Sequence, residues 1–135
     1  MAHLKSDIVE INNSSEKVYN FLSNMNNFGQ LMPEQVINWQ STEDSCSFTI
    51  KGMTDLSMRI SEKTPNSNIT IIPGDNPPFP FTLICQLNEE QKDVTKAQIL
   101  FNAELSMMME LLAKNPLQNF INMLVEKLKE LGDKL

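Results

Sequence analysis

Hydrophobic and polar residues alternate with a period of two along most of residues 36–105. The clearest example is residues 46–51, where Cys46, Phe48 and Ile50 alternate with polar neighbours. A strand with one apolar and one polar face is typical of an antiparallel sheet that covers a core on one side. We therefore predict strands where this alternation recurs, in residues 36–40, 46–51, 56–61, 69–71, 81–87 and 96–105, and a first strand over residues 4–11.

Three polar or proline-rich segments separate these strands. Residues 64–67 have the composition of a turn, and residues 88–93 read as a charged hairpin connection. The segment 73–80 contains Pro77, Pro78 and Pro80, so it can form neither a helix nor a central strand. We expect a loop there, with a lid or a dimer contact around Phe79 as the functional alternatives.

A helical period replaces the alternation just after the first strand. Four apolar residues lie at i, i+3, i+4 and i+7, namely Val18, Phe21, Leu22 and Met25. Residues 12–15 offer several N-cap oxygens, and Asn13 and Glu16 have the spacing of a capping box, which predicts where this helix begins. A second short helical turn should include Phe28, Leu31 and Met32 and end at Pro33.

The C-terminal region predicts a long helix. Asn115 and Pro116 suit its start, because Asn can cap a helix and Pro fits the first helical position. Residues 116–131 carry an apolar stripe and would span about 24 Å. Gly132 is the expected C-terminal cap. Residues 106–113, apolar and rich in methionine, are also predicted to be helical.

This order of elements predicts one α+β domain over residues 1–135. A curved antiparallel β-sheet would wrap around the long C-terminal helix, because both must bury an apolar face. Such an arrangement often keeps an apolar pocket between sheet and helix.

The opening of the chain resembles a known superfamily. Residues 11–24, which run from Ile11 through Asn13, Ser15 and Glu16 to Tyr19, are similar to the Ile-x-Ala-Ser-Pro-Glu-x-Val-Trp-x-x-Leu run of the START/Bet v 1-like (SRPBCC) superfamily. Asn13 replaces the small residue, Ser15 the proline and Tyr19 the aromatic residue. The short second helix and the final helix fit the same family.

The resemblance implies a helix-grip fold with a pocket between the sheet and the last helix. The superfamily includes polyketide cyclases, lipid and hormone carriers, a coenzyme Q-binding group and co-chaperones. Because one fold hosts many activities, the resemblance is more informative about the fold than about the function.

Charge argues against several classes of partner. The formal net charge is -6, and Arg59 is the single arginine. Binding to nucleic acid or to an anionic membrane surface normally requires a basic patch, so we expect neither. No run of about 18 apolar residues predicts a membrane span, and the first ten residues lack the apolar core of a signal peptide. We therefore expect a cytoplasmic protein.

Residues suited to catalysis or metal binding are scarce. His3 is the single histidine, and Cys46 and Cys85 are far apart in the sequence. Neither a metal site nor a Ser-His or Cys-His pair can be assembled from these spacings, and no glycine-rich phosphate loop is present. We expect no catalytic residue, no metal and no cofactor, and we interpret both cysteines as buried thiols. Arg59 falls on the polar face of its strand.

Methionines are unusually frequent beside the apolar stripes. The chain has nine, and Met107, Met108 and Met109 are consecutive. Methionine adapts to irregular apolar shapes, so these residues predict either ordinary core packing or a deformable pocket. Three in a row exceed what one helix face can bury, so some should face a pocket or a partner. Met53 belongs to the same group.

We expect a non-catalytic protein that binds a small hydrophobic ligand of lipid-, polyketide- or isoprenoid-like chemistry between sheet and helix. The candidate ligand-binding residues are Phe28, Met32, Trp39, Phe48, Met58, Phe101, Met108, Phe120 and Leu124. One alternative is a polyketide cyclase or aromatase, which would need Arg59, Asn102 or Glu104 turned inward. The other is a protein-interaction module, either a homodimer or a co-chaperone-like partner, with a packed interior and an exposed apolar patch around the methionine triplet.

Overall fold

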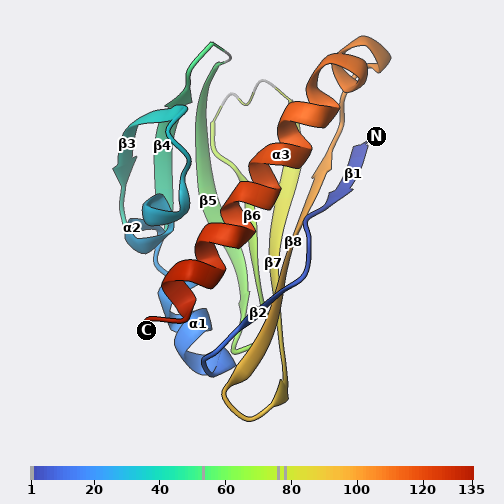
Figure 1. Ribbon diagram of the computed structural model, residues 1–135. Helices are drawn as coiled ribbons and strands as arrows, with labels where there is room; N and C mark the ends of the chain where they lie inside the picture. Colours follow the sequence, from blue (N-terminus) through green and yellow to red (C-terminus); the bar gives the residue numbers. More distant parts are fainter. Residues whose placement is uncertain (1, 53, 76, 78) are drawn as a thin grey trace.

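One curved antiparallel sheet wraps around a long C-terminal helix (Figure 1). The computed structural model describes residues 2–52, 54–75, 77 and 79–135. In these residues the strands follow the order β1-β8-β7-β6-β5-β4-β3, and β2 also pairs with β8. Their bounds are β1 Ala2–Lys5, β2 Val9–Ile11, β3 Val36–Ser41, β4 Ser45–Ile50, β5 Thr54–Thr64, β6 Asn68–Pro73, β7 Phe81–Gln91 and β8 Val94–Ala103. This architecture confirms the predicted α+β helix-grip fold.

Three short helical segments connect β2 to β3. They are α1 (Ser15–Leu22), α2 (Met25–Phe28) and the 3-10 helix η1 (Gly29–Leu31). The N-cap of α1 is Ser14, whose hydroxyl accepts a hydrogen bond from Lys17 N at 3.2 Å. Ser14 is one of the N-cap oxygens that residues 12–15 offered, and it lies one residue after Asn13, which the capping-box spacing had suggested. Asn13 instead bonds the far end of the chain, because its Nδ2 donates to Gly132 O at 3.1 Å and Leu135 O at 2.8 Å.

The predicted first strand is divided into β1 and β2. Lys5 is paired with Leu100, but Val9 is paired with Ala97, so residues 6–8 contain one residue more than the opposing strand. Buried Ser6 keeps its pairing with Ile99 through N–H···O and N–H···Oγ hydrogen bonds of 2.8 Å each. The extra residue turns Ile8 outward, where it is 61% exposed.

The turn between β7 and β8 is shorter than the charged segment 88–93 that was predicted to form it. The strands continue through the polar residues to Gln91 and Val94, which leaves Lys92 and Asp93 as the turn. Asp93 has a φ of 61°, a left-handed turn conformation that Asp tolerates better than most residues. The predicted connection over residues 88–93 was therefore too long, because this hairpin end is exposed on both faces and shows no alternation to follow.

Helix α3 (Met107–Gly132) is longer than predicted and crosses the concave face of the sheet (Figure 1). Its N-cap is Ser106, whose hydroxyl accepts from Met109 N at 3.2 Å, and Pro116 lies inside the helix. The prediction that Asn115 and Pro116 start a helix was therefore wrong. Gly132 is the last helical residue, with Asp133 as the C-cap.

Strand parity places the core between the sheet and α3. Alternate residues of β4, β7 and β8 are buried as predicted, and they meet Leu117, Ile121, Leu124 and Leu128 of α3 within one apolar cluster. The concave face of the sheet is thus the one place where a ligand could contact both layers.

Candidate functional site

The candidate site is a small apolar cavity between the concave face of the sheet and α3. Twelve residues line it, and Thr54 is the one that is not apolar. The lining residues are Met32, Phe48, Ile50, Thr54, Leu56, Met58, Phe79, Phe81, Leu83, Phe101, Leu117 and Phe120. Strands β4, β5, β7 and β8 supply one wall, α3 supplies a second, and the residues after η1 and before β7 close the ends.

The cavity is nearly closed in this conformation. Its volume is about 30 Å³. That leaves room for only one or two water molecules, so an organic ligand requires side chains of the wall to move. Met32 and Met58 belong to the wall, and a thioether side chain changes rotamer easily because it is unbranched.

Stacked aromatic rings shape two sides of the cavity. Phe81 and Phe101 stack at 5.5 Å between ring centroids, and Phe79 tilts against Phe81 at 5.8 Å. On the opposite side Trp39 stacks on Phe48 at 5.5 Å. Rings at these distances contribute attraction beyond their buried area. They give the cavity a rigid outline that the methionines do not have.

The sequence-predicted residues separate into three groups. Met32, Phe48, Met58, Phe101 and Phe120 line the cavity, and Trp39 contacts its wall through Phe48. Phe28 and Leu124 are fully buried in the core but outside the lining. Met108 is 72% exposed and lies away from the cavity. Met53 and Pro78 lie outside the described residues.

Sequence reasoning missed seven lining residues. Strand alternation points inward at Ile50, Leu56, Phe81 and Leu83, so the same parity could have found them. The apolar stripe of the last helix includes Leu117. Thr54 has the same strand parity as Leu56 and Met58, but its polar side chain gave no apolar signal. Phe79 lies before β7, where neither period applies, so only the tertiary structure places it.

The cavity wall has no ionisable group. Arg59 and Glu104 are exposed, and Asn102 Oδ1 accepts a hydrogen bond from His3 Nδ1 at 2.7 Å, outside the cavity. Burial raises the pKa of both Cys46 and Cys85 to about 12, which keeps these thiols protonated and unreactive at neutral pH. Across the described residues, no three His, Cys, Asp or Glu side chains are arranged to hold a metal ion.

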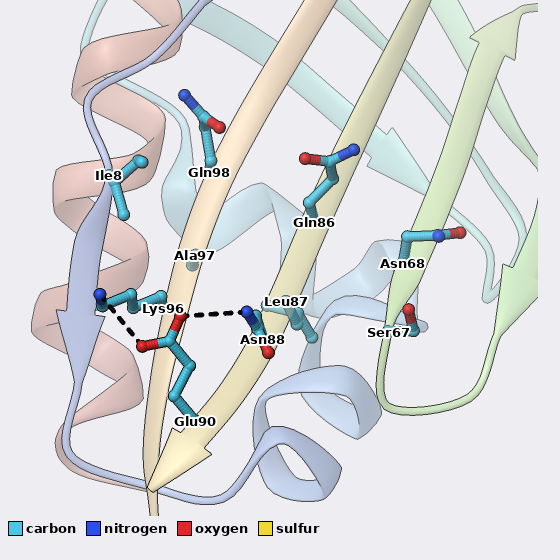
Figure 2. Close-up of a pocket in the computed structure, with 10 residues that line it drawn as sticks. All are labelled: Ile8, Ser67, Asn68, Gln86, Leu87, Asn88, Glu90, Lys96, Ala97 and Gln98. Carbon is cyan, nitrogen blue, oxygen red and sulfur yellow. Dashed lines mark hydrogen bonds and ion pairs between the residues drawn. The ribbon is translucent and has the colours of Figure 1, made fainter.

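A second hollow lies on the outer face of the sheet (Figure 2). It is an open groove of about 380 Å³ that spans β6, β7 and β8. Lys96 pairs with Glu90 at 3.2 Å inside this groove, and Glu90 also accepts from Asn88 at 3.3 Å (Figure 2). Because its charges are already paired and its shape is open, this groove is a weaker candidate than the inner cavity.

Comparison with solved structures identifies the fold. The protein XoxI from Bacillus cereus superposes with a TM-score of 0.76 at 16% identity, over 98% of this chain and 96% of XoxI. A START superfamily protein from Mycobacterium smegmatis superposes with a TM-score of 0.71 at 14% identity, over 98% and 97% of the two chains. This chain has the START/Bet v 1-like fold.

The same START-like fold occurs in a biosynthetic enzyme. The di-domain aromatase/cyclase BexL of the BE-7585A pathway superposes with a TM-score of 0.74 at 13% identity, over 96% of this chain and 46% of BexL. No model of a known protein family matches the sequence, and no curated protein is similar to it. Among the helices of the described residues, none combines the length and the apolar character that crossing a membrane requires.

Proposed function

We propose that this protein binds a small, uncharged, hydrophobic molecule between the concave face of the sheet and α3, and that it catalyses no reaction on it. The observation that carries the proposal is the wall of the cavity, which is apolar at every lining residue except Thr54. Burial of apolar area supplies the binding energy, about 25 cal/mol per Å² removed from water.

The closed cavity defines how binding would occur. A ligand has to displace the flexible side chains of Met32 and Met58, while the stacked rings of Phe81 and Phe101 keep their place. The ligand would then occupy the space that these methionines fill in the empty state, as expected for an adaptable carrier site.

The absence of catalytic groups from the wall favours a carrier over a cyclase. General acid-base chemistry needs an ionisable side chain within hydrogen-bonding reach of the substrate. The cyclase alternative required Arg59, Asn102 or Glu104 to turn inward, and each lies outside the cavity lining. The fold shared with BexL supports a pocket, but it supplies none of these groups.

Native mass spectrometry of the purified protein, compared with its denatured mass, tests the proposal. An additional mass that disappears on denaturation is the expected result. A titration with the uncharged probe N-phenyl-1-naphthylamine then provides a binding assay. A protein that carries no additional mass and gives no probe fluorescence would overturn the proposal.

Substitutions on α3 locate the site. Phe120→Asp places a charge in the cavity wall and should reduce probe affinity at least tenfold. Met123→Asp introduces the same charge one turn away at an exposed position, so probe binding should be unchanged. If Phe120→Asp does not fold, Phe120→Ala replaces it, because the enlarged cavity should bind the probe more tightly. Unchanged binding by a folded Phe120→Asp protein would refute the assignment.

Self-association is the second candidate function. The first turns of α3 expose Met107 at 85%, Met108 at 72%, Leu111 at 85% and Leu112 at 69%. An exposed apolar patch of this kind marks an interaction site, and the small cavity also fits an interaction module. The occupant we propose for it is a second copy of the chain. Sedimentation equilibrium should then give a dimer that Leu111→Glu dissociates, whereas a monomer at all concentrations would exclude it.

A further inference from the structure

The indole N–H of Trp39 is a buried donor without an acceptor. Within the described part of the chain, Trp39 Nε1 is buried and has no hydrogen-bond partner. A buried donor without a partner loses the hydrogen bond that water would give it, so such atoms are uncommon and require an explanation. The indole carries a donor and no acceptor, so only an acceptor atom can satisfy it.

The backbone of β3 is distorted where it places this side chain. Asn38 has a φ of 57°, and the register between β3 and β4 shifts between Ile37 and Gln40. A bulge of this kind re-aims a side chain relative to a regular strand and is over-represented beside functional sites. Asn adopts a positive φ more readily than other residues with a side chain, so Asn38 suits the bulge that orients Trp39.

Gly29 provides the space for the indole edge. A Cβ atom at this residue would lie 2.5 Å from Trp39 Nε1, closer than any side chain allows. Met32 N donates to Gly29 O at 3.2 Å, which places the start of the Met32 segment beside the same site. The indole edge therefore lies beside Gly29, three residues before Met32, and the ring stacks on Phe48. Met32 and Phe48 both line the cavity.

We propose that the ligand carries an uncharged oxygen acceptor, a carbonyl, ester or ether oxygen, which accepts a hydrogen bond from Trp39 Nε1 when the Met32 side chain moves aside. This inference rests on the proposed function, because it assigns the chemical class of ligand for the same site. A carboxylate does not fit, since the cavity wall contains no cation to balance a buried negative charge.

A matched pair of probes tests the inference. Nonan-2-one and 1-nonene have similar apolar chains, but only the ketone has an acceptor. Both are measured by displacement of N-phenyl-1-naphthylamine from the wild-type protein and from Trp39→Phe, which keeps a ring and removes the N–H. The affinity ratio of ketone to alkene should fall by about five- to tenfold in the variant, the range expected for one hydrogen bond.

Two further measurements keep the inference separate from a packing effect. Phe48→Leu alters the same wall but retains the indole N–H, so it should weaken both probes by a similar factor. The single indole N–H resonance in a ¹H–¹⁵N spectrum should move downfield with nonan-2-one and not with 1-nonene. An unchanged ratio in Trp39→Phe, or equal shifts with both probes, would overturn the inference and leave the carrier function standing. Failure of N-phenyl-1-naphthylamine itself to bind, with no additional mass on the purified protein, would overturn both proposals.

Discussion

At the scale of single residues, close approach decides the role of Gly132. A Cβ at this position would lie 2.6 Å from Cγ2 of Ile11, a side chain that is fully buried. Gly132 is the last residue of α3, and Asp133 is the C-cap. The role of the glycine is therefore to let the helix pack closely against β2. Sequence position alone gave the residue the wrong role, because a glycine near a helix end fits both roles.

Gly132→Ala should therefore destabilise the protein. Alanine is the better helix former by about 1 kcal/mol, but the clash with Ile11 should outweigh this gain and lower the free energy of unfolding by about 1–3 kcal/mol. Urea denaturation followed by circular dichroism measures the change. Asn119→Ala, at an exposed position of the same helix, is the control and should be neutral or slightly stabilising. A more stable Gly132→Ala protein would show that Ile11 can move away.

At the scale of elements, α3 has two unequal parts. From Leu117 onward its inner face is buried against the sheet, but the turns before Pro116 expose four of their large apolar side chains by more than two thirds. Pro116 has no N–H to donate to Leu112 O, so the helix lacks one backbone hydrogen bond where the two parts meet. The first turns of α3 are therefore the weakest part of the helix and adjoin the cavity residues Leu117 and Phe120.

Pro116→Ala should strengthen this junction. Restoring the hydrogen bond and removing the ring clash should raise the free energy of unfolding by about 1–3 kcal/mol. Amide hydrogen exchange of residues 107–116 should slow as well. A loss of stability would instead indicate that the proline ring makes a packing contact that the helix needs. Asn115→Ala, at the preceding exposed position, is the control for a general change in helix propensity.

At the scale of the whole molecule, carboxylates connect segments that are far apart in the sequence. Glu89 of β7 accepts from the backbone N of Ser15 at the start of α1, and Asp133 accepts from the backbone N of Asn12 at 2.7 Å. The hydrogen bonds from Ser15 lower the pKa of Glu89, and those from Asn12 and Lys129 lower the pKa of Asp133. Both contacts join the β2–α1 junction to the rest of the fold.

These lowered pKa values predict loss of stability in acid. A carboxyl group with a lower pKa in the folded state stabilises the fold above its unfolded pKa, and this contribution is lost as the pH falls through the folded value. Thermal melts from about pH 6 to about pH 3 should show the decline beginning near the ordinary values of 4.5 for Glu89 and 3.8 for Asp133. Glu89→Gln should be less stable at pH 7 and less sensitive to acid.

Glu62→Gln is the matched control for this experiment. Glu62 is an exposed residue of β5, so its substitution changes the net charge equally without affecting α1. The control protein should retain the acid sensitivity of the wild type. If Glu89→Gln shows the same pH profile as the wild type, the contact with Ser15 does not contribute to the acid response.

The sequence by itself determined the α+β architecture, because periods of two and 3.6 are local consequences of burying one face of a strand or a helix. It therefore predicted the inward residues of β4, β7 and β8, among them Phe48 and Phe101. The tertiary structure alone decided where that periodicity is interrupted, at Ile8, Trp39 and the turns of α3 before Pro116. Whether a strand bulges, or a helix turn stays exposed, depends on the residues that pack against it. Those residues belong to distant parts of the chain, so a local pattern does not reveal them. The cavity is also decided by the tertiary structure, because its volume depends on how closely the sheet and the helix approach each other.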